Sequence, residues 1–116
     1  MLRGYAKGQL VGMPALRIRE AAAGEDWIVA LTGDLDMASA EELDARLTEA
    51  AREHPEGLLI VDLGGLEFMD SAGLRVLLSA ARSPTNGGSR LRLRGARPSV
   101  QRVFEVSGTD VLLPFE

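Results

Sequence analysis

Two short apolar runs, separated by an amphipathic stretch, most constrain the fold of this chain. The runs span residues 27–31 (WIVAL) and 58–61 (LLIV), and their length and composition are typical of buried strands. Between them, Leu43, Leu47 and Ala50 recur at helical spacing and form one apolar stripe. This order predicts two parallel strands joined by a helical crossover, and the unbroken apolar runs predict that both strands are covered on both faces.

The segments on either side extend this pattern along the chain. Leu16 and Ile18 alternate with arginines, which predicts an edge strand with one wet face, and residues 21–26 (AAAGED) then supply a turn. Ser39 and Glu42 have the spacing of a capping box at a helix start. We expect, in order, strand 16–19, strand 27–31, helix 39–54, strand 58–61, a connection through Gly64 and Gly65, a helix from Asp70 or Ser71 to before Pro84, a turn at 86–88, strand 90–94 and helix 98–108.

This order predicts a single α/β domain with a mixed, mostly parallel sheet of four to five strands and three or more helices. The 116 residues, 46% hydrophobic and 26% charged, match one ordinary globular domain. Residues 1–14 are expected to form an N-terminal segment that either adds an edge strand or is loose, and residues 15–116 the domain. Without cysteine, and with no run typical of a signal peptide or a membrane span, the sequence favours a cytoplasmic protein.

Charge is polarised along the chain. Residues 1–70 hold 14 acidic and 6 basic residues, whereas residues 71–116 hold 3 acidic and 7 basic residues. The acidic half argues against direct binding of nucleic acid. The arginines near the end alternate with leucines, which indicates a solvated strand face rather than a nucleic-acid site.

Acidic side chains and one serine fall where the predicted strands end. Asp34 and Asp36 follow the second strand, Asp62 follows the third, and Asp70 and Ser71 stand at the next helix start. Loops that leave the carboxyl ends of strands joined by right-handed crossovers gather at one rim of the sheet, where ligands and partners tend to bind. We therefore expect these segments to converge on a candidate site.

Residues 68–74 (FMDSAGL) are the most informative stretch. Helix capping by Asp70 or Ser71 alone would explain both residues, because such caps are common and contribute about 1 kcal/mol. Gly73 needs another reason, since glycine inside a helix is unfavourable by about 1 kcal/mol relative to alanine. Either close packing or a docking surface would require a small residue there.

The chain resembles the STAS family of anti-sigma factor antagonists over about residues 15–116, through segments 31–36, the helix start at Ser39, 69–74, 98–104 and 107–108. The resemblance implies partner switching. The unphosphorylated antagonist binds an anti-sigma factor that is also a serine kinase, so that the sigma factor is released. Phosphorylation undoes the binding, and a serine phosphatase resets it.

The resemblance also implies roles for single residues. Ser71 matches the family's phosphoacceptor, and Ala72 stands where many members have a second Ser or Thr. Asp36 matches the aspartate that contacts the partner, although an acidic loop residue that favours a helix dipole by about 0.5 kcal/mol would be placed equally well. The implied partner-binding residues are Asp34, Asp36, Ser39, Asp70, Ala72, Gly73 and Leu74.

Other functions find less support in the sequence, and we expect no cofactor and no metal. A receiver domain that accepts phosphate on aspartate with Mg²⁺ would have a lysine beside its acids, but Lys7 is the one lysine and precedes the first strand. A hydrolase would need a base beside its nucleophile, but His54, the one histidine, is expected at a helix end near the rim opposite the candidate site. A constitutive STAS adaptor, with Ser71 only a helix cap, is the alternative that stays open.

Overall fold

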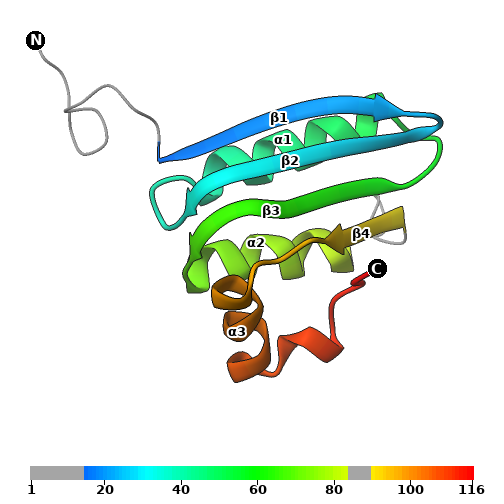
Figure 1. Cartoon of the computed structure of the whole chain (residues 1–116). Coiled ribbons are helices and arrows are strands. Elements are labelled where there is room, and N and C mark those ends of the chain that lie inside the picture. Colours follow the sequence, from blue (N-terminus) through cyan, green and yellow to red (C-terminus); the bar gives the residue numbers. More distant parts are fainter. Residues whose placement is uncertain (1–14, 84–89) are drawn as a thin grey trace, which may run out of the picture.

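The computed structural model describes residues 15–83 and 90–116, which form one sheet covered by helices (Figure 1). The expected segment 1–14 and the expected turn at 86–88 lie outside the described residues. The elements are β1 (Leu16–Ala23), β2 (Asp26–Leu35), α1 (Ala40–Glu53), β3 (Leu59–Met69), α2 (Ser71–Arg82), β4 (Leu91–Arg94), α3 (Pro98–Ser107) and a 3₁₀ turn (Thr109–Val111).

The strands are ordered β1-β2-β3-β4 in the sheet, as in the chain. β1 pairs with β2 in antiparallel register, whereas β2 with β3 and β3 with β4 are parallel. The C-terminal tail adds a single bridge between Leu93 and Phe115 along the outer edge of β4. The predicted mixed, mostly parallel sheet is therefore confirmed.

The described helices lie on one face of the sheet (Figure 1). Among the described residues, the prediction that the inner strands are buried on both faces is therefore wrong for β2, whereas in β3 Ile60 is only 5% exposed on the face away from the helices. Val29 of β2 is fully buried in the core, while its neighbours Ile28 and Ala30 point to the other face and are half-buried. The reason is the strand order. Successive right-handed crossovers that step in the same direction across a sheet place their helices on the same side.

The face of the sheet away from the described helices has arginines on both outer strands. Arg17 and Arg19 of β1 are exposed beside β2, and Arg92 and Arg94 of β4 lie beside β3. The alternation of leucine with arginine in the last strand thus indicated a wet face correctly, with Leu91 and Leu93 buried in the core.

β3 continues eight residues beyond the expected strand, from Asp62 to Met69. Asp62 therefore lies within the strand, beside Arg94 at 3.4 Å, and the prediction that it marks the strand's exit is wrong. Gly64 and Gly65 also lie in β3, next to a register shift in the pairing with β2. A Cβ at position 65 would lie 2.7 Å from the Leu31 carbonyl oxygen, so the bulge requires a glycine there.

The helix limits match the sequence pattern closely. α2 starts at Ser71, α3 starts at Pro98, and Gly108 closes α3 in the left-handed conformation with φ of 76°. The alanines at 21–23 belong to β1, so the hairpin turn is shorter than expected. No helix in the described parts of the chain is long and apolar enough to cross a membrane.

Candidate functional site

The rim at the ends of β2 and β3 is the place where the predicted site residues meet. Leu35 and Met69 are paired at the last step of the parallel register, so the two strands end side by side. The Asp70 N–H donates to the Leu35 carbonyl oxygen at 3.1 Å. The loop after β2 and the first turn of α2 therefore form one continuous surface.

Asp70 ties this surface together. As the N-cap of α2, it accepts hydrogen bonds at Oδ1 from the Ala72 and Gly73 N–H groups, at 2.9 and 3.1 Å. Its second oxygen, Oδ2, accepts the Met37 N–H at 3.2 Å, from the loop after β2. A single carboxylate thus fixes both the helix start and the neighbouring loop.

The side chains of Asp36 and Ser39 stabilise the loop after β2 through hydrogen bonds within it. Asp36 Oδ1 accepts the N–H groups of Ala38 and Ser39 at 3.0 and 3.2 Å. The Ser39 hydroxyl lies at hydrogen-bond distance from the Asp34 carbonyl oxygen, 3.1 Å, and accepts the Asp36 N–H at 3.0 Å. Ser39 precedes α1 as predicted, but its side chain makes no capping bond to the helix, so the capping box with Glu42 does not form.

The predicted site residues after β2 differ in their exposure to solvent. Asp34 and Asp36 are half-buried at the rim, and the Asp34 N–H donates to Ala15 at 2.7 Å. Ser39 is only 7% exposed. Sequence reasoning therefore brought Asp34, Asp36 and Asp70 together correctly, but it did not foresee that Ser39 would lie inside the loop.

Ser71 is exposed at the first position of α2. Its side chain makes no hydrogen bond within the described chain, because Asp70 caps the helix in its place. Capping thus explains Asp70 and leaves the Ser71 hydroxyl free. The next residue, Ala72, is half-buried and adds no second hydroxyl group.

Gly73 and Leu74 are buried, so the small residue at position 73 serves packing. A Cβ on Gly73 would lie 2.5 Å from Leu35 Cγ and 3.1 Å from the Leu35 carbonyl oxygen. The first turn of α2 lies directly against the end of β2 at this point. Close packing, one of the two explanations that the sequence left open, accounts for the glycine.

Gly73→Ala is expected to lower the free energy of unfolding by about 1 to 3 kcal/mol, because the new methyl group overpacks against the fully buried Leu35. Urea denaturation followed by circular dichroism measures the change. In a Leu35→Ala background the clashing atoms are absent, and the same substitution is expected to cost less than half as much. Equal costs in both backgrounds would contradict the packing explanation.

Two apolar side chains at this rim were not singled out in the sequence. Met37 is 79% exposed in the loop after β2, and Phe68 is 50% exposed opposite Asp34. An apolar residue flanked by Asp36 and Ala38 in a short loop was the available signal. Exposed large apolar residues beside acids are typical of protein contact surfaces.

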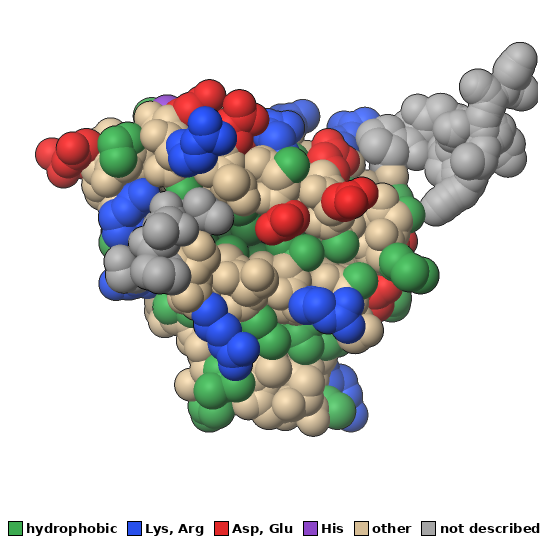
Figure 2. Space-filling model, turned by 180° about the vertical axis from the view of Figure 1, so that it is seen from behind, with side chains coloured by type: hydrophobic (Ala, Val, Ile, Leu, Met, Phe, Trp, Pro, Cys, Tyr) green, Lys and Arg blue, Asp and Glu red, His purple; other side chains and the backbone are tan. Residues whose placement is uncertain are grey.

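The charge asymmetry of the sequence is also an asymmetry of the helical face. Figure 2 shows this face with most acidic side chains in its upper half, mixed with basic ones, whereas the charged side chains of its lower half are mainly basic. α1 accounts for the acidic part, with five acids against two arginines, whereas α2 carries Arg75 and Arg82 and no acid. Ser71 thus lies on the less acidic side of the rim.

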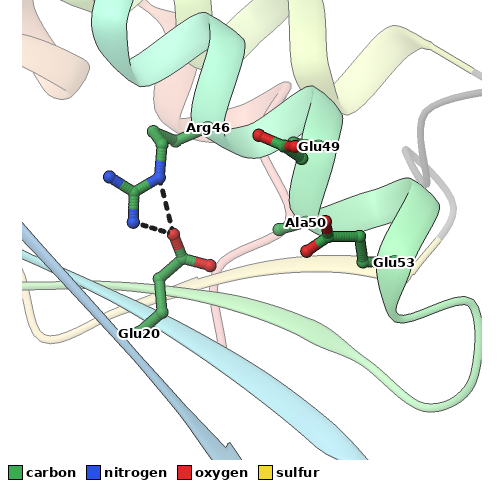
Figure 3. Close-up of a pocket in the computed structure, with 5 residues that line it drawn as sticks. All are labelled: Glu20, Arg46, Glu49, Ala50 and Glu53. Carbon is green, nitrogen blue, oxygen red and sulfur yellow. Dashed lines mark hydrogen bonds and ion pairs between the residues drawn. The ribbon is translucent and has the colours of Figure 1, made fainter.

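Away from the rim, a hollow of about 230 Å³ lies between β1 and α1 (Figure 3). Glu20 pairs there with Arg46 and accepts the Trp27 indole N–H at 2.8 Å. Trp27 in turn stacks on His54, with ring centroids 3.6 Å apart, so the histidine is not simply an exposed helix end. Because these groups satisfy one another, the hollow is a packing feature at the end of the sheet opposite the rim.

The fold and the rim define the class of this protein. It is a small α/β domain in which an exposed hydroxyl group and a hydrogen-bonded loop form one surface at the end of a sheet. In the described parts of the chain, no three His, Asp or Glu residues are placed to hold a metal ion.

Comparison with known proteins identifies the family. A family model described as "Mlab, STAS domain" matches residues 18–114, and the chain therefore belongs to the STAS domain family. BtrV from Bordetella bronchiseptica is 38% identical over 87 residues, which are 75% of this chain and 74% of BtrV. An anti-sigma F factor antagonist from Lysinibacillus sphaericus is 30% identical over 89 residues, 77% of this chain and 76% of that protein.

Solved structures share the fold. An anti-sigma factor antagonist from Mycobacterium paratuberculosis superposes with a TM-score of 0.74 at 21% identity, over 86% of this chain and 84% of that chain. The Bacillus cell fate determinant SpoIIAA in its phosphorylated form gives a TM-score of 0.60 at 24% identity, over 88% and 91%. The fold expected from the sequence is thus confirmed.

Proposed function

We propose that this protein is an anti-sigma factor antagonist that works by partner switching. While Ser71 is unmodified, the protein binds an anti-sigma factor that is also a serine kinase, and the sigma factor is released. Phosphorylation of Ser71 ends the binding, and a serine phosphatase restores it. The protein acts in the cytoplasm as a regulator rather than an enzyme, without direct contact with nucleic acid or a membrane.

The exposed, unbonded hydroxyl group of Ser71 is the observation that carries this proposal. A kinase needs a side chain that it can reach without unfolding the protein, and Ser71 meets this need at the tip of α2. Asp70 caps the helix, so modification of Ser71 removes no bond that holds the fold. The switch can therefore operate on an intact domain.

The relatives support the same function. The Lysinibacillus protein is named as an anti-sigma F factor antagonist, and SpoIIAA has been described in a phosphorylated form. We infer the same class of partner, an anti-sigma factor, for this chain.

The partner surface in this proposal combines charge with apolar area. Asp34, Asp36 and Ser71 offer polar groups, and Met37 and Phe68 offer exposed apolar side chains beside them. Asp70 and the buried residues Ser39, Gly73 and Leu74 position this surface from below, and Ala72 lies half-buried beside it.

The chemical step follows from the groups involved. The γ-phosphoryl group of ATP passes to the Ser71 oxygen, the hydroxyl proton leaves, and ADP is released. The phosphate adds a charge of about −1.5 to −2 at neutral pH, at a point that was a neutral hydroxyl group. A partner fitted to the unmodified surface then meets added bulk and an anion for which it offers no matching cation, which weakens its binding.

Incubation of the purified chain with its cognate kinase and ATP is expected to add one phosphate, on Ser71, which tandem mass spectrometry locates. Ser71→Ala is expected to remain unmodified while still binding the kinase. Ser79 and Ser99 are exposed as well and serve as internal controls that stay unmodified.

A different outcome would favour the adaptor function. If the wild-type chain binds the anti-sigma factor but acquires no phosphate, Ser71 is no switch. If the phosphate appears on Ser79 or Ser99, the site is wrong although the partner class is right.

A further inference from the structure

A groove of about 370 Å³ lies between α2 and α3, and Ser71 is one of the residues that line it. One wall is formed by Ser71 and Leu74 of α2, and the other by residues of α3. The α3 wall includes Ser99, Arg102, Val103 and Val106. Any group attached to the Ser71 oxygen would therefore lie against a groove that is also lined by Arg102.

The helix end cannot itself neutralise such a group. The N–H groups of Ala72 and Gly73 are bonded to the Asp70 side chain, and the Leu74 N–H is bonded to the Asp70 carbonyl oxygen. Helix starts often bind phosphate, but a phosphate on Ser71 would find these three N–H groups occupied, which leaves the Ser71 N–H as the one unbonded donor of the first turn. Its charge must be compensated mainly by side chains.

Five charged side chains lie on the elements that meet near Ser71. Asp70 precedes Ser71, Asp36 lies in the neighbouring loop, and Glu105 lies on α3, so these three oppose a phosphate. Arg75, four residues along α2, and Arg102 on α3 are both exposed and, within the described chain, make no hydrogen bond or ion pair. Arg102 lines the same groove as Ser71, whereas Arg75 lines a different hollow with Arg82.

We propose that Arg102 binds the phosphate when Ser71 is phosphorylated, so that the modified serine bridges α2 and α3 across the groove. Guanidinium presents two parallel N–H donors that match phosphate oxygens. The exposed Ser99 hydroxyl, on the same wall and without a hydrogen bond, supplies a further donor. This inference rests on the proposed function, because it concerns the phosphorylated state.

The bridge would change the surface as well as its charge. Val106 is 80% exposed and forms part of the apolar wall of the groove. A phosphate held by Arg102 would cover this wall and fill the entrance beside Ser71. Phosphorylation would then remove a groove from the partner surface in addition to adding an anion.

The test uses the full chain with phosphoserine placed at position 71 during translation, so no kinase is needed. Phosphorus NMR follows the second pKa of the phosphate, which is ordinarily about 6. A cation beside the dianion lowers this pKa, and we expect Arg102→Gln to raise it by about 0.5 pH unit or more. Arg75→Gln is the matched control, because Arg75 is also exposed and makes no hydrogen bond or ion pair in the described chain. It is expected to change the pKa of the phosphate less than half as much.

Methyl signals give a second measurement. Phosphorylation is expected to shift the methyl resonances of Val103 and Val106 in the wild-type chain and to leave them nearly unchanged in Arg102→Gln. Because Arg102 is exposed, both forms should unfold at the same urea concentration.

Equal phosphate pKa values in the wild-type chain and in Arg102→Gln, or a larger response to Arg75→Gln, would overturn the inference. Either result would leave the proposed partner switching untouched. Conversely, a chain that no kinase modifies would defeat the proposed function even if the pairing with Arg102 is found.

Discussion

Ser71→Asp is expected to weaken binding of the partner anti-sigma factor by about 100-fold or more, whereas Ser71→Ala changes it by less than about threefold. The aspartate places a permanent anion where the unmodified surface has a neutral, exposed hydroxyl group, beside the half-buried Asp36. The alanine removes only an oxygen that makes no hydrogen bond in the free protein. Titration calorimetry with the purified cognate anti-sigma factor measures both affinities.

Ser79→Asp is the matched control for this prediction. Ser79 is an exposed serine on the same helix, two turns further on, and it lines a hollow that does not include Ser71. The same added charge there is expected to change the affinity by less than about threefold, because exposed charges are strongly screened by salt. If Ser71→Ala and Ser71→Asp bound equally well, Ser71 could not be the switch.

Phe104→Ala is expected to reduce the free energy of unfolding by about 3 to 5 kcal/mol, roughly a fifth or more of the stability of a typical small domain. Phe104 is fully buried in the core and meets the Phe115 ring edge to face, with centroids 5.0 Å apart. Its removal leaves a cavity beneath α3 and loosens the tail that pairs with β4. Urea denaturation followed by tryptophan fluorescence gives the value.

Val106→Ala provides the comparison within the same helix. Val106 lies two residues after Phe104 but is 80% exposed, so the loss is expected to stay within about 0.5 kcal/mol. A Phe104→Ala variant as stable as Val106→Ala would show that α3 contributes little to the core.

The helices could be predicted from the sequence because their limits are set locally. The apolar stripe through Leu74 and Leu77 fixes the buried face of α2, and Pro98 and Gly108 bound α3 through backbone conformations that few other residues prefer. Such signals act within one or two turns and do not depend on the rest of the fold.

The strands were less predictable because their ends depend on neighbours distant in sequence. Gly64 and Gly65 have the composition of a turn, yet they lie in β3 at a bulge in its pairing with β2. A side chain at position 65 would strike the Leu31 carbonyl oxygen there. Whether an apolar run is covered on one or both faces depends on the order of strands in the sheet. No local pattern around Ile28 indicates that order.

The site was predictable in outline and not in detail. Topology places Asp36 and Asp70 at one rim, but which N–H groups each carboxylate accepts depends on the loop conformation. No pattern in the sequence distinguishes Arg102, because its proposed role depends on a groove between two helices, in which Ser71 and Arg102 are about 30 residues apart in the chain.

The hydrogen bonds of Asp70 also affect how much conformational entropy is lost when a partner binds. Since one carboxylate holds both Met37 and the first turn of α2, the docking surface is assembled before any partner arrives. Association then costs little conformational entropy in this loop, so most of the interaction energy contributes to affinity. A regulator of this kind signals through a chemical change on a preformed surface. Any conformational change that binding requires is therefore expected in the partner.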